Sequence, residues 1–221
     1  QMPLTDIGTT LIGTLFITIL NSILWFFGIH GTAVIDSFMG PLWYAARFAN
    51  FDMFQASVTA ARQYIVTQDF ANHIIFLGGT GNTVSLAAIM AFKCRSKRIK
   101  SLGKLSLLPG IFNVNEPVIF GLPMVLNPMM ALPFFIVPPV TVLISFCAMY
   151  FGLVPYPTGV TVPWTLPAPF GGWMMCNDWR GGVLQLVVLL IGGLIYYPFI
   201  TALDKQYLKE EQAAPAEEIG G

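Results

Sequence analysis

The sequence predicts an all-α membrane protein, a transmembrane helix bundle with re-entrant hairpins that proline and glycine break. Hydrophobic residues make up 55% of the 221-residue chain and charged residues only 10%, whereas a soluble domain carries about 25% charged residues. The mean hydropathy is +0.70. Several uncharged segments reach the roughly 20 residues that a helix needs to cross a bilayer. The formal net charge of zero argues against a nucleic-acid partner.

We expect four membrane crossings, because four apolar segments without Asp, Glu, Lys or Arg are long enough: residues 7–29, 70–92, 129–153 and 181–203. Two further segments, 109–127 and 155–176, hold prolines and glycines at a density that a regular helix cannot absorb without freeing carbonyls. We expect the first to be re-entrant from the cytoplasmic side and the second from outside. Region 31–69 fits either interfacial amphipathic helices or a second hairpin.

Basic residues orient the chain in the membrane. Six of them crowd into one short segment: Lys93, Arg95, Lys97, Arg98, Lys100 and Lys104. Short loops dense in lysine and arginine face the cytoplasm, so this segment is expected to be a cytoplasmic loop. Residues 204–221 turn acidic and rich in alanine and glycine after Lys205 and Lys209, which predicts a solvated, frayed cytoplasmic tail.

The three cysteines give no basis for a disulfide or a metal site. Cys94, Cys147 and Cys176 form no close pair and no metal-ligand spacing. The basic neighbours of Cys94 would depress the pKa of its thiol, yet we expect no catalytic role for it. No metal and no cofactor is expected.

Glu116 is the candidate site residue that stands out most clearly. It is the only charged residue between Lys104 and Asp178, and no Asp, Glu, Lys, Arg or His follows it through residue 177. An ionisable group at bilayer depth costs about 2 to 4 kcal/mol and usually faces a cavity or a partner on a substrate path. The alternative is a structural carboxylate that caps the amides of a broken helix.

Other polar and aromatic residues are weaker candidates when taken alone. His30 lies between glycines after the first apolar segment, where an interior histidine is the common alternative. Trp25 and Trp164 are by default membrane-interface aromatics, although indole rings also stack on sugar faces. Amide side chains both donate and accept hydrogen bonds, which makes candidates of Asn82, Asn113 and Asn115; the glycine-rich surroundings of Asn82 also suit close helix packing.

Four stretches together resemble one protein family. They are Trp25-Phe-Phe-Gly-Ile-His30-Gly, Gly78-Gly-Thr-Gly-Asn82-Thr, Leu108-Pro-Gly-Ile-Phe-Asn113-Val-Asn115-Glu116-Pro, and Pro163-Trp164 followed by Pro167-Ala-Pro-Phe-Gly-Gly172. This series is similar to the C-terminal half of the membrane component (enzyme IIC) of sugar phosphotransferase systems, lactose/cellobiose/chitobiose type. The resemblance covers nearly all of the chain, with the Asn-Glu-Pro block as its most specific part.

The resemblance implies a sugar permease that binds a β-linked disaccharide and presents its 6-hydroxyl to a phosphorylated IIB partner, with IIA upstream. The phosphate donor would be a phosphocysteine of that partner. It further implies a substrate-binding domain at 1–203, a cytoplasmic tail at 204–221, a bacterial cytoplasmic-membrane location, and a homodimer built through the N-terminal half that this chain lacks.

Within that family, the matching positions implicate seven residues in sugar binding: Trp25, His30, Asn82, Asn113, Asn115, Glu116 and Trp164. Glu116 would also orient the sugar hydroxyl that accepts the phosphate. The rival hypothesis is an ion- or proton-coupled secondary sugar transporter of similar broken-helix design. In that case Glu116 and His30 would form a proton relay.

Overall fold

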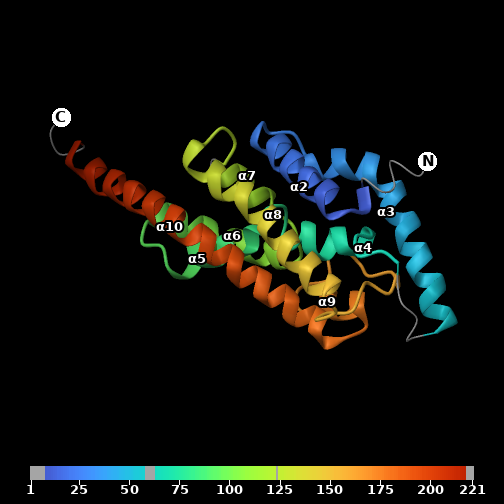
Figure 1. The fold of residues 1–221 in the computed structure, drawn as a ribbon. Helices are drawn as coiled ribbons and strands as arrows, with labels where there is room; N and C mark the ends of the chain where they lie inside the picture. The colour runs from blue at the N-terminus through green and yellow to red at the C-terminus, as the bar shows by residue number, and fades with distance from the viewer. Residues whose placement is uncertain (1–7, 58–62, 123, 218–221) are drawn as a thin grey trace.

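The computed structural model describes residues 8–57, 63–122 and 124–217, apart from the side chains of 214–217, and they form an elongated helical bundle (Figure 1). The regular elements of this described part are all helical, so the predicted fold class is confirmed. In chain order they are α2 (Leu11–Phe26), α3 (Gly31–Ala56), α4 (Gln68–Phe70), the π-helix η1 (Ala71–Ile75), α5 (Thr83–Phe92), α6 (Lys97–Ile111), α7 (Glu116–Gly121), α8 (Pro128–Tyr150), α9 (Phe170–Cys176) and α10 (Trp179–Glu217).

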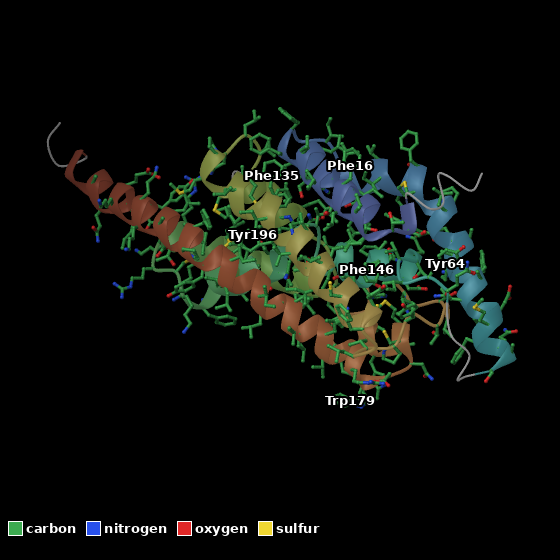
Figure 2. The ribbon with its side chains drawn as sticks, in the orientation of Figure 1. Phe16, Tyr64, Phe135, Phe146, Trp179 and Tyr196 are labelled. Carbon is green, nitrogen blue, oxygen red and sulfur yellow. The ribbon has the colours of Figure 1, made fainter. Side chains whose placement is uncertain are left out.

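Two helices of the described part, α8 and α10, are long and apolar enough to cross a membrane. They correspond to the predicted segments 129–153 and 181–203. Segment 7–29 forms the shorter helix α2, which ends before Gly28 in the left-handed region at φ +79°. Residue 7 lies outside the described residues. Large apolar side chains remain exposed along α2, α8 and α10, as a lipid-facing surface requires (Figure 2).

Helix α8 keeps its course despite Pro133, Pro138 and Pro139. Pro138 has no N–H to offer the carbonyl of Phe134, four residues earlier. The hydroxyl of Ser22 on α2 lies 3.3 Å from that carbonyl and shares its one hydrogen between it and the carbonyl of Thr18, at 3.1 Å. The contact between α2 and α8 therefore satisfies a backbone group that the proline frees.

The expectation of one membrane helix over 70–92 is wrong, because the chain breaks at residues 76–82. Gly78, Gly79 and Gly81 all have positive φ there, and a Cβ on Gly79 would lie 2.3 Å from the Cβ of Asn115. Only Thr83–Phe92 continues as α5, which packs closely on α6. At this contact Gly103 allows the approach, since a Cβ would lie 2.5 Å from the Cβ of Met90.

The α5–α6 hairpin changes two predicted boundaries. The loop predicted to be cytoplasmic shrinks to residues 93–96, because Lys97, Arg98, Lys100 and Lys104 lie on α6. The hairpin predicted at 109–127 has the wrong start. Residues 97–111 form α6, which is the returning arm of the α5–α6 hairpin. Pro123, a predicted break in that hairpin, lies outside the described residues. At the base of the α5–α6 hairpin the N–H of Gly78 donates to the Asn113 side chain at 2.6 Å.

The C-terminal tail was expected to be frayed, and this is wrong for the described residues because α10 continues as a helix to Glu217. Its extension caps the start of α6. The carboxylate of Asp204 accepts from the N–H groups of Arg95 and Ser96 at 2.9 to 3.1 Å. Glu211 accepts from two further N–H groups of the first α6 turn, both at 3.0 Å. Residues 218–221 lie outside the described part.

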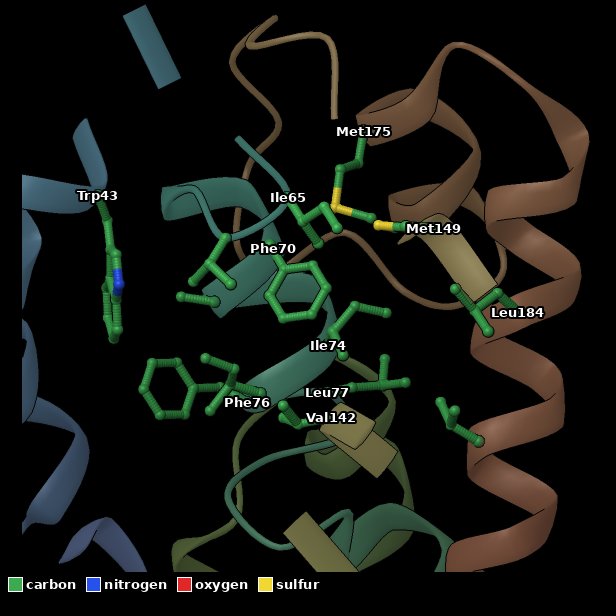
Figure 3. Packing of buried hydrophobic residues seen from close by; sticks show 14 of the residues in the cluster. Trp43, Ile65, Phe70, Ile74, Phe76, Leu77, Val142, Met149, Met175 and Leu184 are labelled. Carbon is green, nitrogen blue, oxygen red and sulfur yellow. The ribbon is translucent and has the colours of Figure 1, made fainter. Parts of the chain in front are cut away.

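The largest apolar core surrounds η1, between α3, α8, α9 and α10 (Figure 3). Trp43, Phe70, Ile74 and Met175 are fully or nearly fully buried there. Of the two interpretations of 31–69, the described residues show one long helix, α3, and not a hairpin. Residues 58–62 lie outside the described part. The irregular segment 155–169 contributes Val162 to this core and leads into α9. Trp164 on this segment lines a cavity together with residues of the broken elements.

Candidate functional site

A cavity of about 370 Å³ lies among the broken elements, within the roughly 300 to 1,000 Å³ range of small-molecule sites. Five of the seven predicted site residues line it: His30, Asn113, Asn115, Glu116 and Trp164. They come together there because several regular helices begin or end at the cavity. Helix α3 begins after His30, α6 ends before Asn113, and α7 begins at Glu116.

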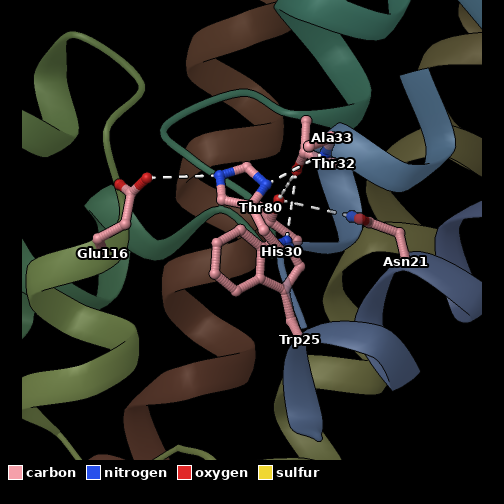
Figure 4. Close-up of polar contacts among 7 residues, drawn as sticks. All are labelled: Asn21, Trp25, His30, Thr32, Ala33, Thr80 and Glu116. Carbon is pink, nitrogen blue, oxygen red and sulfur yellow. Dashed lines mark hydrogen bonds and ion pairs between the residues drawn. The ribbon is translucent and has the colours of Figure 1, made fainter. Parts of the chain in front are cut away.

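His30 and Glu116 lie next to each other on the cavity wall, with 3.5 Å between Nε2 and Oε1 (Figure 4). Nδ1 of His30 accepts the N–H of Ala33 at 3.1 Å and thereby caps α3. A neutral imidazole that accepts at Nδ1 carries its proton on Nε2, so the N–H points at the carboxylate. The side chains of His30 and Glu116 are 52% and 43% exposed, and Oε2 of Glu116 has no hydrogen-bond partner within the described part of the chain.

Trp25 supports His30 from beneath, which differs from its predicted role as an open sugar platform. The ring is 1% exposed and lies 4.4 Å from the His30 ring, centroid to centroid. Its Nε1 donates to Thr32 at 3.3 Å, and Thr32 pairs with Thr80 at 2.8 Å (Figure 4). With its faces covered by protein, Trp25 fixes the position of His30 and offers no free surface to a ligand.

Asn113 connects the site to the segment that carries Trp164. It adopts φ +66°, its Oδ1 accepts the N–H of Gly78, and its Nδ2 donates to the carbonyl of Trp164. The indole of Trp164 stays 52% exposed. Asn115 is buried and its Nδ2 has no partner among the described residues. Asn113 is thus committed to the backbone, whereas Asn115 keeps unused hydrogen-bonding capacity.

Asn82, also a predicted site residue, does not line this cavity. It has left-handed geometry, at φ +57°, before α5. Its Nδ2 donates to the carbonyl of Val188 on α10 at 2.9 Å, and its Oδ1 accepts from Ser85 at 2.9 Å. Asn82 therefore serves close helix packing, the alternative interpretation of its glycine-rich surroundings.

Several cavity residues were missed from the sequence: Thr32, Asp36, Tyr44, Gln68, Asn72 and Thr80. Most come from α3 and from the α4–η1 turn, where the sequence left two architectures open. The charge of Asp36 was visible, but nothing in the sequence indicated which face of a helix it would occupy.

Cys94 lies away from the cavity, in the turn between α5 and α6. Burial, reinforced by the nearby carboxylate of Asp204, raises the pKa of its thiol to about 12. The predicted depression by basic neighbours is therefore wrong, because these side chains extend into solvent while the sulfur is 5% exposed. A thiol in this state is a poor nucleophile.

Comparison with known proteins identifies the family. A family model described as "Phosphotransferase system, EIIC" matches residues 4–138. The chain is 42% identical to the oligo-beta-mannoside-specific EIIC component of Bacillus subtilis (strain 168), over 99% of this chain and 49% of that protein. It is also 42% identical to the cellobiose-specific EIIC component of Geobacillus stearothermophilus, over 96% of this chain and 48% of that protein.

A solved structure agrees with this result. The transporter ChbC, the IIC component from the N,N'-diacetylchitobiose-specific phosphotransferase system, superposes with a TM-score of 0.92 at 40% identity, covering 96% of this chain and 49% of that one. The chain spans about half the length of these relatives. The family model matches this chain, and its fold agrees with that of ChbC. The chain therefore belongs to the EIIC family of membrane components of the phosphotransferase system.

Proposed function

We propose that this protein is the sugar-binding part of a phosphotransferase permease. It takes a β-linked disaccharide of the cellobiose, chitobiose or lactose type into the cavity and presents the sugar's 6-hydroxyl for phosphorylation during import. The observation that carries this proposal is the Glu116 carboxylate at the cavity wall, which lies beside His30 and has one oxygen without a partner in the described part of the chain.

The chemistry of the pair suits phosphoryl transfer to a hydroxyl. Glu116 accepts a hydrogen bond from the 6-hydroxyl and so fixes the direction of its oxygen, while the Nε2–H of His30 stabilises the carboxylate. As the hydroxyl oxygen bonds to phosphorus, its proton passes to Glu116 and the bond from phosphorus to the donor sulfur breaks. The donor thiolate remains on the IIB partner, so this chain orients the acceptor only.

Sugar recognition falls to the surrounding residues. Trp164 offers an exposed indole face to a pyranose ring, and Asn115 offers a hydroxyl its Nδ2, which has no partner among the described residues. Asn113 holds both the hairpin base and the Trp164 backbone in position. His30, Asn115, Glu116 and Trp164 are thus the proposed direct contacts, with Asn113 and Trp25 as supports.

The phosphorylated IIB partner, itself supplied by IIA, is proposed to approach from the cytoplasm. The basic turn at 93–96 and the end of α10 lie together through Asp204, and the positive-inside rule assigns both to that side. The chain is then a multi-pass protein of the bacterial cytoplasmic membrane with a cytoplasmic C-terminus. A homodimer, implied by the resemblance through the family's N-terminal half, belongs to the same proposal.

Glu116→Gln tests the proposal, because it keeps the shape of the side chain and removes its charge and basicity. Uptake of radiolabelled cellobiose as its 6-phosphate, with IIA and IIB supplied, should fall by about a hundredfold or more, at unchanged membrane insertion. Glu210→Gln, an exposed change on α10, is the matched control. Uptake by Glu116→Gln equal to that of the control would make Glu116 a structural carboxylate.

The product also separates this proposal from ion- or proton-coupled transport. Sealed vesicles should accumulate sugar phosphate and should tolerate uncouplers while phosphate donor is present. Recovery of free sugar as the main product, sensitive to an uncoupler, would overturn the assignment.

A further inference from the structure

A second polar cluster lines the same cavity and plays no part in the chemistry above. It consists of Asp36 on α3, Gln68 on α4 and Asn72 on η1. Asp36 lies six residues beyond His30 on α3, a helical rise of about 9 Å. A sugar ring held at Glu116 therefore leaves this part of the cavity for a second ring.

The cluster holds the Asp36 carboxylate in place. Gln68 donates one amide hydrogen to Oδ1 of Asp36 at 3.0 Å and the other to Oδ1 of Asn72 at 3.3 Å. The π-helical turn at 71–75 follows α4, which begins at Gln68, and the hydrogen bond between Gln68 and Asn72 brings the two side chains together. Such turns occur frequently at functional sites.

Gln68 supports Asp36 with its amide nitrogen, while its own carbonyl oxygen lacks a partner among the described residues. Gln68 is 4% exposed, and its Oε1 has no hydrogen-bond partner within the described residues. An unpaired buried acceptor is unfavourable and calls for an explanation. Turning the amide over would not pair Oε1 either, because it would then face two other acceptor oxygens, those of Asp36 and Asn72; the orientation of Gln68 therefore serves Asp36.

The carboxylate of Asp36 is itself an acceptor-only group. Its side chain is half-buried and lines the cavity, and the ion pairs of the described residues do not include it. An ionised carboxylate with remaining lone pairs binds hydroxyl groups strongly. Tyr44, on the same helix, adds a partly exposed aromatic ring to this wall.

We propose that Asp36 forms a second subsite, which accepts hydrogen bonds from hydroxyl groups of the second sugar ring, and that Gln68 is its positioning residue. This inference rests on the proposed function, in which the first ring lies at Glu116. The subsite makes the cavity selective for disaccharides over monosaccharides, and for a second ring that presents hydroxyl donors to the carboxylate.

The test compares two ligands that differ by one ring, cellobiose and methyl β-glucoside, by calorimetric titration of the purified protein in detergent. Asp36→Asn should raise the Kd for cellobiose about fivefold or more and leave the Kd for methyl β-glucoside within about twofold. Asp52→Asn, an exposed change on the same helix, should alter neither. Gln68→Leu should reproduce the selective loss, as a positioning residue must.

Equal weakening of both ligands by Asp36→Asn would indicate a general disturbance and would overturn the subsite, as would unchanged cellobiose affinity. Should one of the two variants fail to fold, the other carries the same comparison. Wild-type protein that binds neither sugar would refute the proposed function itself, which distinguishes that failure from failure of the subsite alone.

Discussion

Replacing Trp164 by alanine should separate sugar binding from stability. Its indole is 52% exposed and lines the cavity, so the fold loses little apolar contact when the ring is removed. Its carbonyl remains bonded to Asn113, so the segment keeps its course. A tryptophan presents at most about 250 Å²; a sugar ring that covers half of the exposed part removes about 65 Å² from water. At about 25 cal/mol per Å² this is about 1.6 kcal/mol, or about fifteenfold in Kd.

The measurement is a calorimetric titration of the purified variant with cellobiose, alongside its Tm in detergent. Trp173→Ala supplies a matched control, because Trp173 is also 52% exposed but does not line the cavity. We expect weaker binding for Trp164→Ala alone and similar Tm values for both variants. Equal affinities in the two variants would refute the stacking argument, and Trp164 would then be an interface aromatic.

Three further predictions concern α10, the residue before it and the turn at 93–96. Asp204→Ala should lower the free energy of unfolding by about 2 to 3 kcal/mol, since two backbone N–H groups lose their acceptor; an unchanged Tm would contradict this. Hydrogen bonds from Arg180 lower the pKa of Asp178 below 3.8. This stabilisation is therefore present above pH 3.8 and is lost as the pH falls through the lowered value, so the Tm difference between wild type and Asp178→Asn should shrink in that window and not at higher pH. Because burial raises the pKa of Cys94 to about 12, a maleimide at pH 8 should label it only after unfolding in detergent; rapid labelling of folded protein would show the thiol to be accessible.

The parts of the fold that could be predicted are those fixed by local sequence. Apolar length is a local property, so α8 and α10 follow from composition alone, and Gly28 marks the end of α2. The glycines before Asn82 interrupt the segment 70–92 in the sequence, but how the chain turns at 76–82 could not be predicted in the same way. It depends on the close packing of Gly103 against α5 and on the bond between Gly78 and Asn113, contacts that exist only in the folded chain.

The candidate site shows the same division. Glu116 was identifiable because a single carboxylate in an apolar stretch can be recognised from the sequence alone. The role of Trp25 was not, since its burial beneath His30 arises from the turn between α2 and α3. The pairing of Asp36 with Gln68 spans 32 positions and is set by how α3 meets α4. The tail was misjudged for a similar reason, because its carboxylates are helix caps for a distant segment.

The capping of α6 by α10 gives the molecule a mechanical link between two distant places. One end of the α5–α6 hairpin is fastened to the long helix by Asp204 and Glu211, and the other end is fastened to the cavity by the bond between Gly78 and Asn113. The 15 residues of α6 rise about 22 Å between them. The hairpin is therefore a rigid connection between the C-terminal part of α10 and the cavity, and we expect a displacement of that part of α10 to shift the cavity residues.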